Sequence, residues 1–407
     1  MDSHPSDTPV TPARQSTGPN GVGRRGVLAG AGLATVAGLF GAAAGAAPAA
    51  AKPAKPATSM PVRFNDDGKL KILQINDTQD THLTDRRTIE LIETSLDTEK
   101  PGLVVLNGDT INGGPATEQQ VKQAYNNIIR PIEERGVKWA MVFGNHDEDS
   151  LGNDTGMTEQ KIVDWIHDVY PNNLNPAIDP KLYGHSNGQL LIRSSRANEP
   201  AFGVWLFDSN RYAPGTIGGQ SREGLKNYDW IHADQVNWYR EASLATEERY
   251  GRKIPSLAFF HIPLWEHHHL WFGSQFGSDP ATHAAAAKKH GIVGEKHEDV
   301  YVGAWNSGLY AAMQERGDVR GVYVGHDHIN TYMGDYYGIE LGYGPGTGYG
   351  TYGLPGAEQH RLRGTRVFEL DENADGVYTG TRTLFAKDLG IDTTPGHQRI
   401  DEPAPLP

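Results

Sequence analysis

The stretch Val319–His328, VRGVYVGHDH, decides the fold and locates its chemistry. The run from Val319 to Val324 is apolar and rich in valine, which predicts a buried strand. The strand ends in Gly-His-Asp-His, where one residue separates the two histidines. In an extended segment both imidazoles project to the same face and Asp327 points away. The stretch therefore predicts a sheet that delivers two metal-ligating histidines at its edge.

Three other apolar runs end in the same way. LVVLNGD ends at Asp109, AMVFGNHD carries Asn145, and LAFFHIP carries His261. Parallel strands bring their carboxyl ends to one edge of a sheet, where open α/β sheets hold their sites. We therefore expect these three side chains in one cleft with His326 and His328. Oxygen and nitrogen ligands of this kind suit hard or borderline divalent metals.

Strand-like and helix-like patterns alternate through the first part of the chain. They predict strands over 70–76, 103–106 and 139–143, and helices over 88–100 and 118–134. This β-α-β-α-β order is typical of a parallel sheet covered by helices. Later segments predict helices over 157–170 and 234–250, antiparallel strands over 182–207, core strands over 256–260 and 319–324, and a β-prone segment over 338–386 that closes a second sheet.

In this order, Gly-Asp, Gly-Asn-His-Asp, a lone His after a strand and Gly-His-Asp-His resemble the motifs of the calcineurin-like metallophosphoesterases. The resemblance covers about residues 68 to 386. From Asn306 to the Gly-rich segment 342–353, the chain resembles the branch of probable phosphatases close to the purple acid phosphatases. The resemblance implies an α/β fold, a four-layer α/β/β/α sandwich with two central mixed β-sheets.

The same resemblance implies hydrolysis of a small phosphate monoester or diester by a metal-bound hydroxide. The cofactors would be two divalent ions drawn from Mn, Fe, Zn, Mg and Ca. Purple acid phosphatases carry a Tyr three residues after the bridging Asp, and this chain has Asn112 there. A tyrosinate–iron site is therefore not expected.

The resemblance also assigns roles residue by residue. The first metal would be held by Asp77, Gln79, Asp109 and His328, and the second by Asp109, Asn145, His261 and His326. His146 would face the substrate as the catalytic residue, protonating the leaving oxygen or binding a phosphoryl oxygen. Asp147 is expected to be its partner.

The first motif departs from the family pattern. The family has Asp-x-His after the first strand, and this chain has Asp77-Thr78-Gln79. A second register, Asp80-Thr81-His82, would restore the His, but Asp77 directly follows the strand. A Gln ligand is neutral and weaker than imidazole, so we expect the first metal to bind less tightly than the second. The alternative function is a non-catalytic phosphate-ligand-binding protein on a degenerate site.

Three other segments contain further candidate residues. The histidines in Trp265–His269 are consecutive and so do not share one face, which favours a polar loop at the cleft rim over an extra metal cluster. Tyr343 or Tyr349, in the Gly-rich segment, is a candidate substrate contact. Asn306 is either a helix N-cap or another substrate contact.

The amino terminus indicates export. Arg24-Arg25 precedes a Gly/Ala-rich apolar run and a small-residue zone, as in a twin-arginine signal. The expected organisation is a signal over 1–51, a linker over 52–64, the phosphoesterase domain over 65–386 and a tail over 387–407. The partner would be the twin-arginine export machinery, and the location secreted or cell-envelope/periplasmic. An uncleaved anchor is the alternative, but no permanent membrane span is expected.

Composition excludes several classes of protein. The formal net charge is -13, which argues against stable nucleic-acid binding, since that requires a basic surface. The chain has no cysteine, so disulfides, Cys–zinc sites and thiol nucleophiles are excluded.

Overall fold

The computed structural model describes residues 60–225, 227–273 and 280–407. The chain divides into two units, Met1–Pro56 and Ala57–Pro407. The expected export signal lies outside the described residues, and the second unit is described here. No helix among the described residues is long and apolar enough to cross a membrane.

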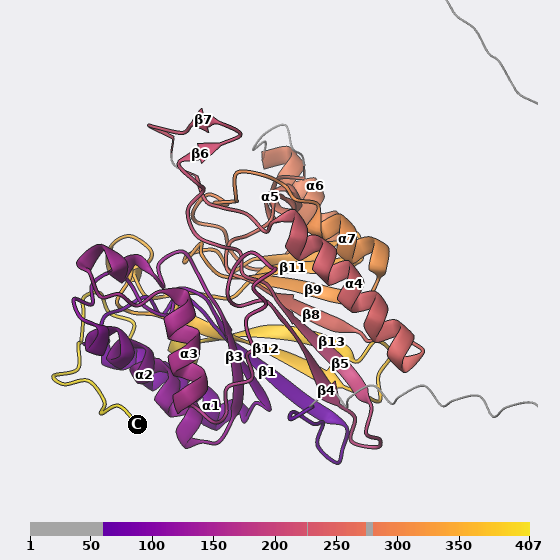
Figure 1. Ribbon diagram of the computed structural model, residues 1–407, viewed down its shortest axis with the longest axis horizontal. Coiled ribbons are helices and arrows are strands. Elements are labelled where there is room, and N and C mark those ends of the chain that lie inside the picture. The colour runs from indigo at the N-terminus through magenta and orange to yellow at the C-terminus, as the bar shows by residue number, and fades with distance from the viewer. Residues whose placement is uncertain (1–59, 226, 274–279) are drawn as a thin grey trace, which may run out of the picture. The chain divides into compact units, whose positions relative to one another are not determined.

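The first sheet has the strand order β13-β12-β1-β2-β3 (Figure 1). Its parallel part is β1 (Lys69–Ile75), β2 (Leu103–Asn107) and β3 (Lys138–Val142). β12 (Gly364–Asp371) pairs antiparallel with β1, and β13 (Tyr378–Phe385) pairs antiparallel with β12. The carboxyl ends of β1, β2 and β3 therefore meet at one edge of the sheet.

The second sheet has the order β10-β11-β9-β8-β5-β4. β5 (Pro200–Leu206), β8 (Ser256–Phe259), β9 (Val319–Val324) and β11 (Ile339–Tyr343) run parallel. β10 (Met333–Tyr336) and β4 (Gly188–Arg193) are antiparallel strands at its two edges. A short hairpin, β6 (Thr216–Ile217) and β7 (Gln220–Ser221), projects from the body (Figure 1).

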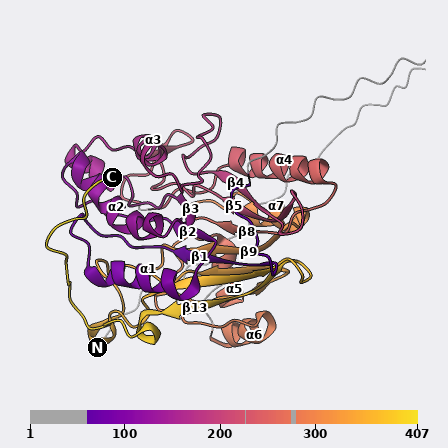
Figure 2. The same cartoon turned by 90° about the horizontal axis from the view of Figure 1, so that it is seen from below.

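The helices cover the outer faces of the two sheets, which gives four layers (Figure 2). α1 (Arg86–Glu99), α2 (Glu118–Glu134) and α3 (Glu159–Val169) cover the first sheet. α4 (Ala233–Tyr250), α5 (Trp265–Phe272) and α7 (Leu309–Arg316) cover the second, and α6 (Pro280–His290) packs against α5. The expected four-layer sandwich with two mixed sheets is confirmed.

Alternation along β1 shows how the layers are built. Leu73 and Ile75 pack with the first helical layer, whereas Leu70 and Ile72 join the core between the two sheets. The same inter-sheet core contains Leu257 from β8, on the opposite sheet. Because strand side chains alternate between faces, each central strand is apolar on both faces, which is why these strands are near-continuous apolar runs.

Two sequence predictions need correction. Of the segment 338–386, only β11 joins the second sheet, while β12 and β13 complete the first. The stretch Trp265–His269 is not a loop but the start of α5, which ends at Gly273 in a left-handed conformation. His267 is fully buried there and accepts a hydrogen bond from the backbone N–H of Leu264 at 3.3 Å.

The carboxyl-terminal segment after β13 contains only a short 3-10 helix, Ala386–Leu389, and otherwise lacks regular structure. It nevertheless binds along α1 and α2. The backbone N–H of Gln398 donates to the Asp85 carboxylate at 2.7 Å, and that of Ala404 donates to Asn127 at 3.0 Å. The expected tail is therefore an irregular strap held against the first helical layer.

Candidate metal centre

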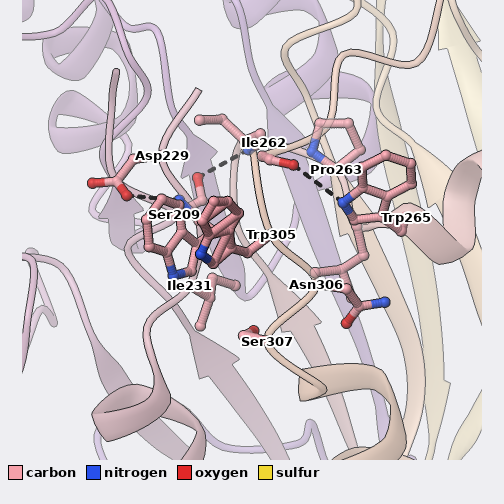
Figure 3. Close-up of a pocket in the computed structure, with 12 residues that line it drawn as sticks. Ser209, Asp229, Ile231, Ile262, Pro263, Trp265, Trp305, Asn306 and Ser307 are labelled. Carbon is pink, nitrogen blue, oxygen red and sulfur yellow. Dashed lines mark hydrogen bonds between the residues drawn. The ribbon is translucent and has the colours of Figure 1, made fainter. Parts of the chain in front are cut away.

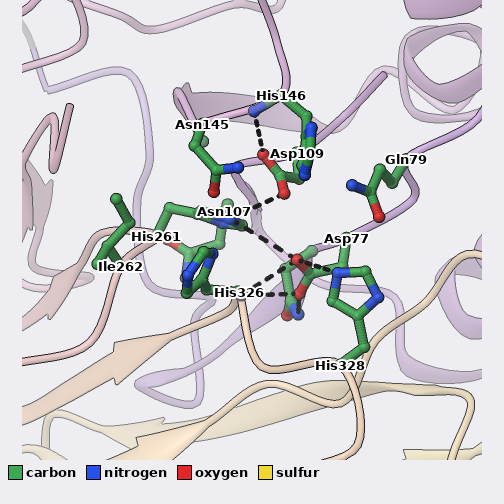
Figure 4. A network of polar contacts seen from close by, with 12 residues as sticks. Asp77, Gln79, Asn107, Asp109, Asn145, His146, His261, Ile262, His326 and His328 are labelled. Carbon is green, nitrogen blue, oxygen red and sulfur yellow. Dashed lines mark hydrogen bonds and ion pairs between the residues drawn. The ribbon is translucent and has the colours of Figure 1, made fainter. Parts of the chain in front are cut away.

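The strand ends of both sheets bring the predicted ligands together (Figure 4). β1 leads to Asp77, β2 to Asp109, β8 to His261, and β9 to His326 and His328. All of these side chains are buried. Asn145 follows β3 and is buried too. The five residues that the strand pattern placed in one cleft therefore lie in one cluster with Asp77.

The cluster consists of two ligand groups with one shared carboxylate. The ligand atoms of Asp109, His261 and His326 lie within 4.8 Å of one another, and so do those of Asp77, Asp109 and His328. His261 Nε2 is 3.1 Å from Asp109 Oδ2, and His328 Nε2 is 3.4 Å from Asp77 Oδ1. Asp109 therefore stands where a bridging ligand between two cations would stand.

Two buried polar atoms of the cluster, Asn145 Oδ1 and His326 Nε2, lack a hydrogen-bond partner. Two more, Asp109 Oδ2 and His261 Nε2, meet each other at 3.1 Å. An atom without a partner costs about 1–3 kcal/mol when buried away from water. Asp109, His261 and His326 form the second group, and Asn145 lies beside them (Figure 4). Two oxygens and two imidazole nitrogens form a suitable donor set for a divalent cation. The residues therefore fit a metal at this position.

Hydrogen bonds and burial determine which ring nitrogen of each histidine faces the cluster and whether the ring is charged. His261 Nδ1 lies 3.0 Å from the carbonyl of Asn107, which fixes the proton on Nδ1 and leaves Nε2 for the cluster. Burial lowers the pKa of His326, and it lowers that of His328 to about 3. Both rings are therefore neutral, as metal binding requires.

The pKa values of the two cluster carboxylates, Asp77 and Asp109, shift in opposite directions. Burial raises the pKa of Asp77 to about 6, and the charge of Asp109 adds to this effect, although His261 opposes it. Burial also acts to raise the pKa of Asp109, but the charge and hydrogen bond of His261 hold it well below its usual range. For His261, burial acts to lower the pKa, but Asp109 and Asp77 outweigh it and raise it to about 10. Without a metal, the protonated His261 offsets the charge of the carboxylates, and a bound cation would take the place of that proton.

The backbone is strained where it presents the ligands. Asp77, Asp109 and His326 have φ angles of 51°, 50° and 75°, in the left-handed region that L residues rarely adopt. Gly144 lies so close to the cluster that a Cβ there would be 2.3 Å from Asp109 Oδ1. Strain of this kind clusters at functional sites, where the surrounding structure enforces it.

Gln79, the predicted further ligand of the first metal, lies beside the first ligand group, and its amide oxygen already has a partner. Thr351 Oγ1 donates to Gln79 Oε1 at 2.5 Å and lies 3.3 Å from His328 Nδ1. The ring of Tyr352 stacks on His328 at 4.1 Å. Thr351 therefore ties Gln79 to His328 and leaves His328 Nε2 toward Asp77.

The alternative register of the first motif is not supported. The carboxylate of Asp80 accepts the backbone N–H groups of Thr81 and Asp85 at 2.8 and 2.9 Å, so it closes a turn. His82 belongs to neither ligand group. Asp77, which directly follows β1, lies in the cluster instead.

His146 lies beside the cluster, about one third exposed. Its backbone N–H donates to Asp109 Oδ1 at 2.8 Å, and its Nδ1 pairs with Asp149 Oδ2 at 2.6 Å. Burial acts to lower the pKa of His146, but the hydrogen bond to Asp149 and the charges of Asp109 and Asp149 outweigh it, so the pKa is raised. The shift therefore favours the protonated ring, whose Nδ1 is already engaged by Asp149.

The prediction that Asp147 partners His146 is wrong, because Asp149 has that position. Asp147 is fully buried, and its oxygens accept the backbone N–H groups of Asp109, Thr110 and Gly144 at 2.7–2.9 Å. The hydroxyl of Tyr125 on α2 also donates to it at 2.8 Å. Asp147 therefore joins the loops after β2 and β3 beneath the ligands, and it does not face the substrate.

The sequence interpretation missed the residues that surround His146. Arg211 donates to Asp149 at 2.6 Å and to Glu148 at 2.5 Å, and the hydroxyl of Tyr212 donates to Asp149 at 3.1 Å. The available signals were the i+3 spacing of Asp149 from His146 and the position of Arg211 just after β5. Neither is specific without the fold.

The other candidate contacts lie elsewhere. Tyr343 and Tyr349 are fully buried, so neither contacts substrate. The Tyr343 hydroxyl donates to Asp327 at 2.6 Å, which holds the Asp away from the cluster as predicted. Asn306 is not the N-cap of α7, which is Gly308, although its side chain accepts the N–H of Gly308 at 2.9 Å.

The chain is similar to several known proteins. The sequence profile of the calcineurin-like phosphoesterases matches residues 70–330. The chain is 30% identical over 354 residues to "Probable inactive purple acid phosphatase 29" of Arabidopsis thaliana, covering 79% of this chain and 82% of the relative. It is 28% identical to "Phosphatase DCR2" of Saccharomyces cerevisiae, covering 78% of this chain and 54% of that protein.

Among solved structures, a dimetal phosphatase from Danio rerio aligns with a TM-score of 0.43 and 14% identity, covering 78% of this chain and 98% of the other. The profile match spans β1 to the residues just after His328, and so includes all the strands that carry the cluster. This chain therefore belongs to the calcineurin-like phosphoesterase family.

Proposed function

We propose that this protein is a phosphoesterase that hydrolyses phosphate monoesters or diesters with two divalent cations. The observation that carries the proposal is the pair of buried ligand groups that share Asp109. The buried Asn145 Oδ1 and His326 Nε2, which have no hydrogen-bond partner, support it, because a cation would satisfy them.

The proposed first site consists of Asp77, Gln79, Asp109 and His328, and the second of Asp109, Asn145, His261 and His326. Divalent ions bound there would polarise the phosphoryl group and lower the pKa of a coordinated water. Two carboxylates leave part of the charge of two divalent cations uncompensated. The centre would thus attract a phosphate group although the protein is acidic overall.

His146 would hold the proton that the leaving group needs. Its Nδ1 is hydrogen-bonded to Asp149, so Nε2–H is the proton available to the leaving oxygen. The raised pKa of His146 favours the protonated ring near neutral pH. Arg211 holds Asp149 in place from the other side. Such a positioned acid is typically worth about 10² to 10⁴-fold in rate.

The second candidate is a non-catalytic phosphate-ligand binder. It is favoured by Gln79 in place of a histidine and by the word "inactive" in the name of the Arabidopsis relative. The name of the yeast relative, a phosphatase, points the other way. The intact His146–Asp149 pair favours catalysis, since binding alone does not require a proton donor.

The test combines elemental analysis of the purified protein with a phosphoester panel. The panel contains an aryl monoester, an alkyl monoester and an aryl diester, each assayed with added Mn²⁺. Catalysis is supported by turnover that requires metal and is lost in Asp109→Asn. Two metals per chain with phosphate binding but no turnover of any ester would establish the binding function instead.

We further propose export by the twin-arginine route, on the basis of Arg24-Arg25 and the weakly apolar run behind them. The variant with both arginines replaced by Lys should accumulate inside the cell, because this route requires the pair. Normal yield outside the cell would contradict the proposal.

A further inference from the structure

A large cleft opens beside the metal centre. Its volume is about 1440 Å³, and its aromatic lining consists of Tyr212, Tyr228, Trp265, Tyr301 and Trp305. We call this the aromatic cleft. Trp305 is 49% exposed and Tyr301 is 46% exposed. Aromatic surface exposed in a concave region is typical of a ligand site.

The inner wall of the aromatic cleft is also the outer wall of the metal centre. The Tyr228 ring meets the His326 ring edge to face at 4.3 Å. The Tyr212 hydroxyl donates to Asp149 at 3.1 Å and accepts from Asn145 at 3.3 Å. A phosphoester whose phosphoryl group lies at the centre, with its leaving oxygen near His146, would therefore extend its organic group along these two tyrosines.

The charge of the lining selects against a charged organic group. No carboxylate lines the aromatic cleft among the residues that the structure describes, and the guanidinium of Arg222 donates to the carbonyls of Ala213, Pro214 and Leu225. On the other side of Tyr212 lies a hollow of about 570 Å³, in which Glu148 pairs with Arg211 and Glu159 with His185. Among the described residues, the lining of the aromatic cleft contains no carboxylate to form such an ion pair, so this cleft is the favoured direction for an uncharged organic group.

Trp305 lines the aromatic cleft and also the small pocket next to it, which Figure 3 shows. Trp305 stacks on Trp230 at 5.2 Å, and Trp230 stacks on His232 at 4.8 Å. Trp265 beside it donates its Nε1–H to the carbonyl of Gly303 at 3.1 Å. Rings fixed in this way lose little entropy when a flat ligand group stacks on them.

We infer that the aromatic cleft binds the organic group of the phosphoester, and that this group is large, flat and uncharged, a fused aromatic ring or a nucleobase. The inference rests on the proposed phosphoesterase function. It names Trp305 and Tyr301 as residues that determine specificity, separate from the metal ligands and His146.

The experiment compares 2-naphthyl phosphate with phenyl phosphate, whose leaving groups have similar acidity. We expect the wild type to prefer the naphthyl ester by about tenfold in kcat/KM, since stacking interactions with a base or ring are of this order. Trp305→Ala should reduce that ratio to near one, mainly through KM, and Trp305→Phe should restore part of it. Tyr337→Ala removes another exposed aromatic side chain, outside the cleft, and should leave the ratio unchanged.

Two further substrates show whether the flat group is a nucleobase or a simple arene. Adenosine 5′-monophosphate tests a nucleobase, and ribose 5-phosphate is its matched substrate without a base. A Trp305-dependent preference for the nucleotide assigns the cleft to nucleobases, whereas a preference confined to the naphthyl ester assigns it to simple arenes. Equal losses for all esters in Trp305→Ala, or no change in any ratio, would overturn the inference.

Binding of 2-naphthylphosphonate, measured by calorimetry on the metal-loaded protein, separates this inference from the proposed function. If no ester is hydrolysed but Trp305→Ala weakens phosphonate binding about tenfold, the cleft assignment stands and the hydrolytic function fails. If esters are hydrolysed and Trp305→Ala binds the phosphonate as the wild type does, the cleft assignment fails alone.

Discussion

The two ligand groups of the cluster differ in the donors that they offer to a metal. The second group has two imidazoles, His261 and His326, and Asn145 lies beside them. The first has one imidazole, His328, and Thr351 holds the Gln79 amide beside it. Since an amide oxygen is a weaker donor than imidazole, the second should bind metal more tightly. The shared Asp109 should make the two sites depend on each other.

The largest effect should come from Asp109→Asn, which removes the charge common to both groups. We expect metal content to fall below one per chain and kcat/KM to fall by at least about 10³-fold, because several kcal/mol of charge stabilisation are lost. Metal is counted by elemental analysis after gel filtration. His82→Ala, outside both groups, is the control. Retention of two metals in Asp109→Asn would contradict the shared role.

His146→Ala should reduce turnover by about 10² to 10⁴-fold while both metals stay bound, because the ring donates a proton and is in neither ligand group. The loss should be smaller for an aryl ester than for an alkyl ester, since a good leaving group needs no proton. Equal losses for the two esters would leave His146 as a binding residue only.

Asp149→Asn provides the corresponding pH test. An acid loses activity as the pH rises through its pKa, and Asp149 raises the pKa of His146. Removing that carboxylate should therefore move the alkaline limb of the kcat/KM profile to lower pH. If the alkaline limb of the kcat/KM profile does not move, a group other than His146 determines it.

Thr351→Val, which is nearly isosteric, should weaken the first metal by about 10- to 100-fold and leave the second within about threefold. Outer-shell partners of metal ligands commonly have effects of this size. The hydroxyl contacts both Gln79 and His328, and neither residue belongs to the second group. Calorimetric titration resolves the two affinities. Equal weakening of both sites would show that Thr351 does not act on the first metal alone.

Acid should compete with the metals, and the sign follows from Asp77. Its pKa in the metal-free fold is raised to about 6 from 3.8, so its proton stabilises that fold fully below about pH 4, and this contribution is lost as the pH rises through 6. A metal would replace the proton. Metal affinity at the first site should therefore weaken by up to about tenfold for each pH unit below pH 6. Unfolding temperatures with and without Mn²⁺ from pH 4.5 to 7.5 measure the difference, which should grow with pH.

The smallest effect should come from substitutions of Gln79, which change the affinity of the first metal. Gln79→His should tighten the first metal by a few-fold, up to about tenfold, because imidazole is a stronger donor than an amide oxygen. Gln79→Ala should weaken it, and His82→Ala should change neither site. If His82→Ala instead removed one metal per chain, the register at Asp77 would be wrong.

The sequence was sufficient wherever a ligand type followed a strand. Asp109, Asn145, His261 and His326 were found because each ends an apolar run, and parallel strands align their carboxyl ends. It was insufficient where partners come from distant loops. Asp149 and Tyr212 are 63 positions apart, and no pattern within either loop encodes their contact.

The same limit applies to the fold. The β-propensity of 364–385 was visible, but the preference of β12 for the edge beside β1 was not, because propensity does not specify a pairing partner. The helix α5 was missed since its histidines suggested polar surface, whereas one of them, His267, is buried as part of the core. Burial of a polar side chain depends on tertiary contacts that a local pattern does not contain.

The left-handed backbone at Asp77, Asp109 and His326 also has an evolutionary consequence. Each position costs about 1–3 kcal/mol that a glycine would not incur. A mutation there that abolishes metal binding can leave the fold as stable as before, or more so. Loss of catalysis from this scaffold is therefore thermodynamically easy, and only selection for turnover would keep the ligands in place. A lineage released from that selection can retain the sandwich and become a binding protein without passing through an unstable intermediate.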